Sequence, residues 1–284
     1  MYADDTQLYL RFYPKDWAKA KQVMEDCICE IRLWLSKNCL KLNDGKTEFL
    51  LIGQPHHLKF LAKCFTSLTI GEVSVIPASS AGNLGAIIDC NVKMNKQVGN
   101  VCRSCYAHLR WIGQIRHYLS NVSAAKLVHA FITSKLDNLN SLLINIPAYL
   151  MRRLQLIQNN AARIVVRLQL HCHITVTLKD LHWLPVKARV EYKVLLLTYK
   201  ALNGKAPIYL SDMLHYKESK RALRSSSQHL LEVPTTRLVT VGDRSFSAYA
   251  PKVWNSLPLH IRLSKSVDVF KKEIKTFLFK KYVK

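Results

Sequence analysis

Two adjacent carboxylates near the start of the chain, Asp4 and Asp5, are the side chains best suited to metal-dependent chemistry. They stand in Tyr2-Ala3-Asp4-Asp5, and the β-forming residues on both sides predict two short strands, 1–3 and 6–12, around a tight turn. Neighbouring carboxylates repel each other unless a cation lies beside them. Oxygen ligands open to phosphates suit Mg²⁺, and a pair of such ions can activate a hydroxyl and stabilise a departing pyrophosphate. An ordinary acidic turn is the alternative.

The chain carries a large and uneven excess of positive charge. It has 42 Lys and Arg against 19 Asp and Glu, for a formal net charge of +23. An excess of this size predicts an anionic partner, most often nucleic acid. Residues 1–142 hold 17 basic and 11 acidic side chains, whereas residues 143–284 hold 25 and 8. We therefore expect a polyanion to lie mainly against the second half of the chain.

Residues 148–167 predict a helix with two chemically different faces. At ~100° per residue, one face collects the apolar side chains Leu150, Leu154, Ile157, Ala161, Ile164, Val165 and Leu168. The opposite face carries, beside Asn159 and Asn160, the arginines Arg152, Arg153, Arg163 and Arg167. Arginine suits phosphate oxygens because its planar fork donates two hydrogen bonds at once. We expect this face to contact nucleic acid; a solvated charged face is the alternative.

The remaining pattern predicts short strands early in the chain and helices later. Pro14 opens a helix that ends near Asn38, and its expected core face consists of Val23, Cys27, Ile31, Trp34 and Leu35. Further strands are expected at 46–52, 68–70, 73–76 and 84–88. Helices are expected at 93–118, 122–136, 148–167, 186–203, 207–215 and 266–281, with a basic loop-rich connection at 216–243. We expect Trp183 and Trp254 to lie in the core.

The eight cysteines do not predict a disulfide framework, because the chain opens without a basic and then apolar signal segment. No uncharged apolar run approaches the ~20 residues that a membrane helix needs. Cys102-Arg-Ser-Cys105 has the spacing of half a zinc site, but His171 and His173 stand far along the chain. Buried thiols on a helix are the simpler interpretation, and a zinc-dependent interaction module on these four residues is an alternative.

The order of several motifs resembles the reverse transcriptases of non-LTR (LINE-type) retrotransposons. The hairpin at 2–5 followed by a helix resembles motif C of that family, and Leu42-Asn43 with Lys46-Thr47-Glu48 resembles motif D. Residues 83–89 (NLGAIID) resemble motif E. Segments similar to the thumb, and to the C-terminal region of CR1/L2-like elements, are 131–137 (FITSKLD), 154–163 (LQLIQNNAAR), 181–186 (LHWLPV) and 254–258 (WNSLP). The resemblance covers essentially the whole chain.

The resemblance implies a role for each matching residue. Asp4 is the metal-binding aspartate and Asp5 its less direct partner, with Mg²⁺ or Mn²⁺ as the cofactor of the intact enzyme. Tyr2 is expected near the minor groove of the template–primer. The strand that begins with Leu84 and Gly85 is expected to grip the primer end.

Lys46 resembles the motif D lysine, a candidate general acid for the departure of pyrophosphate; a solvent-exposed strand lysine is the alternative. The implied partners are an RNA template and a DNA primer. The implied location is intracellular, in the nucleus or cytoplasm, with no membrane contact.

The expected fold is α+β. A partial palm of a β-hairpin, short strands and helices, with motifs C, D and E, is expected at 1–90, a helical thumb at 91–170, and a basic, mainly helical region at 171–284. In this family a third metal-binding carboxylate, the fingers and an endonuclease lie upstream of the YADD motif. We therefore expect two-metal nucleotidyl transfer in the intact enzyme and none from this chain alone. A non-catalytic, basic nucleic-acid-binding remnant is the alternative.

Overall fold

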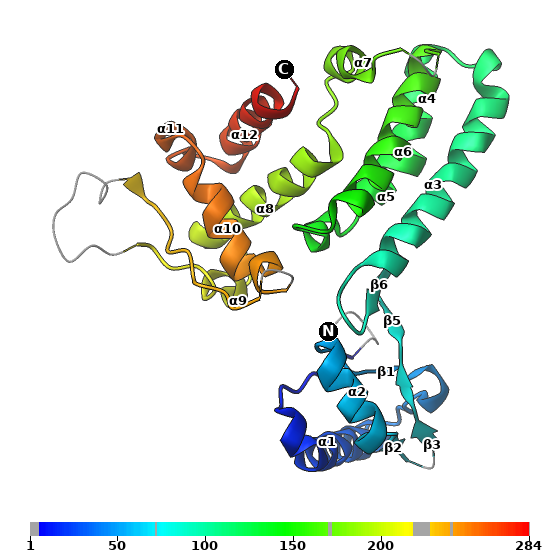
Figure 1. Cartoon of the computed structure of the whole chain (residues 1–284), viewed down its shortest axis with the longest axis vertical. Helices are drawn as coiled ribbons and strands as arrows, with labels where there is room; N and C mark the ends of the chain where they lie inside the picture. The colour runs from blue at the N-terminus through cyan, green and yellow to red at the C-terminus, as the bar shows by residue number, and fades with distance from the viewer. Residues whose placement is uncertain (1–5, 72, 170–171, 218–227, 239–240, 284) are drawn as a thin grey trace. The chain divides into compact units, whose positions relative to one another are not determined.

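A computed structural model describes residues 6–71, 73–169, 172–217, 228–238 and 241–283. The chain divides into two units, Met1–Lys96 and Gln97–Lys284. Among the described residues, the strands lie between Phe49 and Asp89 and helices predominate from Asn95 onward (Figure 1). This mixture of sheet and helix agrees with the expected α+β class.

The first unit combines two helices with short paired strands. Helix α1 (Trp17–Lys37) follows a 3-10 turn, η1 (Pro14–Asp16), and helix α2 (Pro55–Cys64) follows a second such turn, η2 (Asp44–Lys46). The strands are β1 (Phe49–Leu50), β2 (Leu68–Ile70), β3 (Val73–Val75), β4 (Pro77–Ala78), β5 (Ser80–Asn83) and β6 (Ala86–Asp89). They pair two by two: β1 runs parallel to β4, whereas β2 with β3 and β5 with β6 are antiparallel.

An aromatic cluster around Phe65 forms the core of the first unit. The ring centroid of Phe65 lies 5.1 Å from that of Phe49, 6.2 Å from Trp17 and 6.4 Å from Phe12. The same core includes Ile28 of α1 and Leu68 and Ile70 of β2. Packing around Phe65 therefore joins α1, α2 and the first strands.

The expected core face of α1 is wrong in part. Val23 and Trp34 are 45% and 60% exposed, whereas Ala20 and Ile28 are buried and Met24 is partly buried. Residues 20, 24 and 28 are four apart and so form a stripe of their own. The helix offers two apolar stripes, and contact with Phe65 and β2 selects the second.

Two of the expected strands are also corrected. Residues 6–12 form no strand, and within 46–52 the strand is limited to Phe49–Leu50. Among the described residues, 6–12 have no strand partner, and a strand needs the backbone hydrogen bonds of a neighbour to be stable. The strand expected at 1–3 lies outside the described residues. The strand predicted at 68–70 is confirmed, the one predicted at 73–76 is confirmed except for its last residue, and α2 was not predicted.

The second unit is helical throughout its described regular elements. Two long helices, α3 (Asn95–Ile115, whose first two residues belong to the first unit) and α6 (Ala148–Val166), come first, and α8 (Val186–Leu202) follows. Between and after them lie η3 (Arg116–Tyr118), α4 (Asn121–Val128), a π-helix η4 (His129–Thr133), α5 (Ser134–Asp137), η5 (Asn140–Leu143), α7 (Ile174–Asp180), α9 (Ile208–Ser211), η7 (Gly242–Arg244), α10 (Phe246–Asn255), α11 (Leu259–Arg262) and α12 (Val267–Tyr282).

Helix α8 lies at the centre of the second unit and packs against α6, α10 and α12. Tyr199 of α8 stacks on Phe270 of α12 with ring centroids 4.2 Å apart, and Trp254 of α10 lies 5.9 Å from the same Phe270. Trp254 and Trp183 are 2% and 5% exposed, which confirms their expected place in the core.

The predicted helices at 148–167, 186–203 and 266–281 are confirmed within a few residues. The predicted helix at 93–118 ends earlier and continues as the 3-10 turn η3, and the one at 207–215 is limited to Ile208–Ser211. In the part of the chain that is described, no helix is both long and apolar enough to cross a membrane.

Candidate nucleic-acid interface

The residues that resemble the catalytic motif, Tyr2, Asp4 and Asp5, lie outside the described residues. Close to them in the sequence, the side-chain amide of Gln7 donates a hydrogen bond to Oδ1 of Asn83. Asn83 is the last residue of β5, 76 positions along the chain. The segment that directly follows the two carboxylates is therefore held against the β5–β6 hairpin.

Lys46 is exposed and ends the η2 turn. That turn is anchored by Asp44, whose Oδ1 lies 2.5 Å from Nη1 of Arg32 on α1. Two residues after Lys46, Oε2 of Glu48 accepts a hydrogen bond of 2.8 Å from the backbone N–H of Gly82 in β5. The segment that resembles motif D thus also reaches the β5–β6 hairpin.

Leu84 and Gly85 form the two-residue turn of this hairpin, whereas the sequence predicted that they begin a strand. Both have a positive φ, 45° for Leu84 and 83° for Gly85. Two such residues in succession are typical of hairpin turns whose twist matches that of the strands. Leucine rarely adopts this conformation, and Leu84 is 50% exposed. An apolar side chain is therefore held at the tip of the hairpin.

The stretch from residue 90 to residue 179 contains twelve Lys and Arg and a single acidic residue, Asp137. It runs from α3 into α7, whose last residue Asp180 lies just beyond it, and Asp137 is itself paired with Arg189 of α8 at 2.6 Å. A surface with so few carboxylates attracts polyanions because the positive charges are not offset locally. The charge totals of residues 1–142 and 143–284 do not reveal this stretch, because it crosses residue 142.

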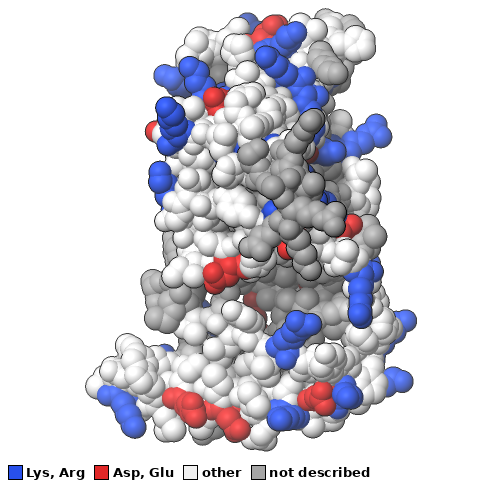
Figure 2. Space-filling model, turned by 90° about the vertical axis from the view of Figure 1, so that its left-hand side faces the viewer, with Lys and Arg blue, Asp and Glu red and all other residues white. Residues whose placement is uncertain are grey.

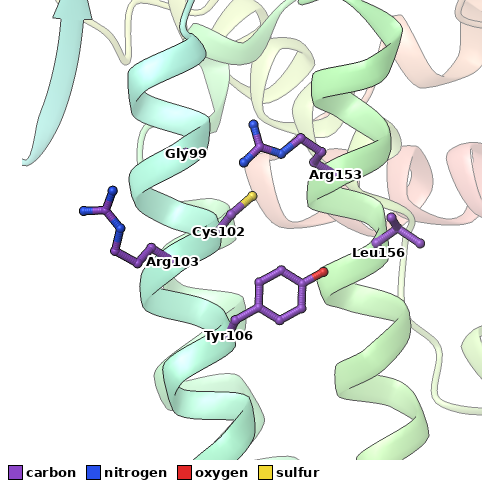
Figure 3. Close-up of a pocket in the computed structure, with 6 residues that line it drawn as sticks. All are labelled: Gly99, Cys102, Arg103, Tyr106, Arg153 and Leu156. Carbon is purple, nitrogen blue, oxygen red and sulfur yellow. The ribbon is translucent and has the colours of Figure 1, made fainter.

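A pocket of about 380 Å³ lies between α3 and α6 (Figure 3). Its lining consists of Gly99, Cys102, Arg103, Tyr106, Arg153 and Leu156. Arg153 reaches from α6 toward Cys102, and the ring of Tyr106 projects from α3 toward α6. Guanidinium groups beside a phenol ring can bind phosphate oxygens and stack on a sugar or base. The candidate interface consists of this pocket and of the exposed Arg152, which precedes Arg153 in the sequence.

The four arginines expected on one face of α6 divide into two pairs. Arg152 and Arg153 are exposed. Arg163 is half-buried and its Nη2 lies 3.4 Å from the carbonyl oxygen of Cys172. Arg167 is the C-terminal cap of α6, with φ 57°, and donates to the carbonyl oxygen of Arg116 at 3.3 Å. The first pair lies at the surface, with Arg153 beside the thiol of Cys102, and the second pair binds the chain's own backbone.

Arg116 has a structural role that the sequence did not indicate. It is 7% exposed, and its guanidinium donates to the carbonyl oxygens of Ile164 at 2.6 Å and Val165 at 2.7 Å in the last turn of α6. It also donates to Leu119 O at 2.6 Å and to Oδ1 of Asn121 at 2.5 Å. The carbonyls of Ile164 and Val165, in the last turn of α6, have no partner inside the helix. Arg116 therefore caps α6 and joins it to the end of α3.

The cysteine pair of α3 has the properties of buried thiols. Cys102 and Cys105 are 5% and 0% exposed, and burial raises the pKa of the Cys105 thiol to about 11. Burial also raises the pKa of Cys102, against the opposing charge and hydrogen bond of Arg153. Zinc binds the thiolate form, which these environments disfavour. His171 lies outside the described residues, within which no group of three or more His, Cys, Asp or Glu could hold a metal ion.

A second basic surface lies on α12. Lys272, Lys275 and Lys280 are exposed there. Figure 2 views the molecule from the side on which α11 and α12 lie in Figure 1, and blue side chains outnumber red ones over its upper part. This helix also carries Asp268 and Glu273, so its charge is partly offset.

No protein-family model, no curated protein and no solved structure matches this chain.

Proposed function

We propose that this chain is the C-terminal portion of a reverse transcriptase similar to those of non-LTR retrotransposons. In the intact enzyme it would copy RNA into DNA by two-metal nucleotidyl transfer, with Asp4 and Asp5 as metal ligands. Asp4 and Asp5 would hold Mg²⁺ or Mn²⁺, which would supply activation of the primer hydroxyl and positive charge for the departing pyrophosphate. Lys46 is proposed as the proton donor to that pyrophosphate.

One observation supports this proposal: Gln7, which follows the motif C residues in the sequence, and Glu48 of the motif D segment both contact the strand β5. Gln7, just after the expected metal ligands, contacts Asn83, and Glu48, just after Lys46, contacts Gly82. Nucleotidyl transfer takes place at the primer terminus, so a turn that grips this terminus must lie close to the metal ligands. The two contacts support that arrangement, because they join Gln7 and Glu48 to the hairpin of Leu84.

The stretch 90–179, with its single acidic residue, supports an RNA template and a DNA primer as the partners. With template and primer bound, the exposed Arg103, Arg152 and Arg153 would contact phosphates, and Tyr106 would lie against a sugar or base. Nucleic acid offers phosphates to the arginines and a sugar or base to the aromatic ring, whereas a small anion offers only the charge. The combination therefore favours nucleic acid. The same observation also fits a non-catalytic protein that binds nucleic acid, which is the second candidate function.

A photo-crosslinking experiment distinguishes the two candidates. Leu84 is replaced by p-benzoylphenylalanine, and the full chain is bound to an RNA template with a recessed DNA primer labelled at each position in turn. Since Leu84 is half-exposed at the tip of the hairpin, the larger side chain is accommodated. The matched control carries the same crosslinker at Ile76, which is 73% exposed in the same unit.

We expect crosslinks from position 84 at the last nucleotides of the primer and fewer from position 76. Crosslinks from position 84 that are spread evenly along the duplex would favour the non-catalytic candidate. Absence of any binding to the template–primer would contradict both candidates.

A further inference from the structure

An exposed group of aromatic rings lies on the flank of α3 away from the pocket. Trp111 of α3 is 59% exposed and Phe131 of the π-helix η4 is 43% exposed. His108 lies between them: its ring stacks on Phe131 with centroids 5.2 Å apart and an interplanar angle of 17°, and it meets Trp111 edge to face at 5.2 Å. We call these three residues the aromatic platform.

His108 is held in one orientation by the backbone. Its Nδ1 lies 2.6 Å from the carbonyl oxygen of Ser104. A carbonyl can only accept, so Nδ1 carries the proton and Nε2 is the second polar position of the ring. The ring between Trp111 and Phe131 is thus fixed rather than free to rotate, and a fixed ring loses less conformational entropy when a ligand stacks on the group.

The π-helix is the backbone feature that brings Phe131 to this position. Residues 129–133 adopt the wider turn between α4 and α5, a rare geometry that is found frequently at functional sites. Phe131 packs on His108 and still exposes 43% of its surface. An apolar residue that served only the core would be buried like its neighbour Ile132, which is 1% exposed.

The charge around the aromatic platform selects its ligand. Residues 90–136 contain no acidic side chain. Arg110 precedes Trp111 in the sequence, and Lys135 follows Phe131 by four residues. An apolar surface of a partner protein would gain nothing from contact with these cations. A polyanion that carries flat aromatic groups would contact both the cations and the rings. Nucleic acid with unpaired bases has that combination, and stacking of bases on aromatic side chains is the usual way in which proteins hold it.

We propose that His108, Trp111 and Phe131 form a stacking surface for the unpaired bases of a single-stranded nucleic acid. This inference rests on the proposed function and deepens it, because it assigns the unpaired part of the template a site separate from the α3–α6 pocket. The bases of a duplex are stacked on each other and are not available to the aromatic platform. Single strands should therefore depend on these rings, and duplexes should not.

The test measures the affinity of the full chain for a labelled 12-nucleotide single strand, as RNA and as DNA, and for the matching 12-base-pair duplex, by fluorescence anisotropy. The variants are Trp111→Leu and Phe131→Leu, which keep an apolar side chain but remove the ring. Trp34→Leu is the control, since Trp34 is 60% exposed on α1 of the other unit. Circular dichroism monitors folding, and Trp111→Phe tests whether any aromatic ring suffices.

Each ring removed should weaken single-strand binding by about tenfold or more, with duplex binding changed less than about twofold. The salt dependence should keep its slope, because stacking releases no counterions. Trp111→Phe should retain most of the affinity, and Trp34→Leu should retain all of it. A similar loss for RNA and DNA would identify the bases as the shared ligand, and a loss for one alone would assign the site to that nucleic acid.

Two results would overturn the inference. If the folded Trp111→Leu and Phe131→Leu variants bind single strands as the parent chain does, the rings are not a stacking surface. If they lose duplex and single-strand binding equally, the site does not select unpaired bases. Both results are distinct from a failure of the proposed function, in which the parent chain itself would bind neither nucleic acid.

Discussion

The side-chain amide of Gln7 donates a hydrogen bond to Oδ1 of Asn83, so the residues just after Asp5 are held at the tip of a hairpin 76 residues away. The backbone N–H of the neighbouring Gly82 donates a hydrogen bond to Oε2 of Glu48. These two contacts join Gln7 and Glu48 to the same strand, and Asp4 and Asp5 lie outside the described residues. They also lead to the first prediction.

Replacing Asn83 with alanine should loosen the segment 6–13. A hydrogen bond of this kind contributes about 1 kcal/mol, which corresponds to roughly a fivefold change in the local opening equilibrium. Hydrogen–deuterium exchange of peptides from this segment should therefore be faster in Asn83→Ala. Ser74→Ala, an exposed change on β3 of the same unit, is the control. Equal exchange in both variants would mean that the hydrogen bond does not hold the segment.

Arg116→Lys should destabilise the second unit despite the retained charge. Lysine cannot reproduce the planar fork that binds Ile164, Val165 and Leu119 at once, and buried carbonyls left without a donor cost about 2 kcal/mol in total or more. The expected fall in melting temperature is roughly 4–8 °C for a unit of this size. The exposed Arg110→Lys on the preceding helix α3 should leave the melting temperature unchanged, and equal melting of the two variants would exclude the capping role.

Tyr282 should make stability fall at alkaline pH. Burial, followed by its hydrogen bond to Glu191, raises the pKa of the Tyr282 phenol above its ordinary value of 10.0. A folded-state pKa above the unfolded one means that the unfolded chain loses its proton first, so this contribution is complete below pH 10 and is lost as pH rises above it. Tyr282→Phe should therefore be less stable than the parent at pH 8.

The difference between Tyr282→Phe and the parent should narrow above pH 10, as measured by urea unfolding between pH 8 and pH 11.5. Tyr9→Phe, at a position that is 95% exposed, controls for the general effect of lysine and tyrosine ionisation. A difference that stays constant over this range would show that the phenol does not ionise differently in the two states.

The charge at the α3–α6 pocket should determine the salt dependence of binding to a template–primer. The triple variant Arg103→Gln, Arg152→Gln, Arg153→Gln should flatten the log–log slope by about two to three, at roughly 0.7–0.9 for each phosphate that the protein no longer neutralises. The control Lys272→Gln, Lys275→Gln, Lys280→Gln on α12 removes the same charge. We expect it to change the slope by less than one.

Equal flattening by both triple variants would indicate a diffuse charge effect and would argue against a specific interface at the pocket. Arg163 and Arg167 are left unchanged in this test, because their bonds to backbone carbonyls would confuse loss of binding with loss of stability.

The local periodicity of the sequence determined the long helices. The apolar stripe of residues 148–167 predicted α6, and its positions Leu150, Leu154, Ile157, Ala161 and Val165 are buried in the structure. The stripe of α12 was equally readable, with Phe270, Ile274 and Leu278 buried. Such patterns can be read directly because a helix places residues three and four apart on one face, whatever it packs against. The composition likewise determined the basic character of the second unit.

Contacts between distant residues decided the rest. Which stripe of α1 is buried depends on Phe65, and the selection of Ile28 over Trp34 cannot be read from the helix alone. Arg116 and Arg110 have the same side chain on neighbouring turns, yet only Arg116 meets the end of α6. The aromatic platform joins His108 to Phe131 across the turn between α3 and α4, through a π-helix that no pattern indicated. Sequence patterns determine which side chains a segment can bury. The segment that packs against it in the folded chain determines which of them are buried and which remain at the surface. The α3–α6 pocket and the aromatic platform consist mostly of side chains that remain at the surface.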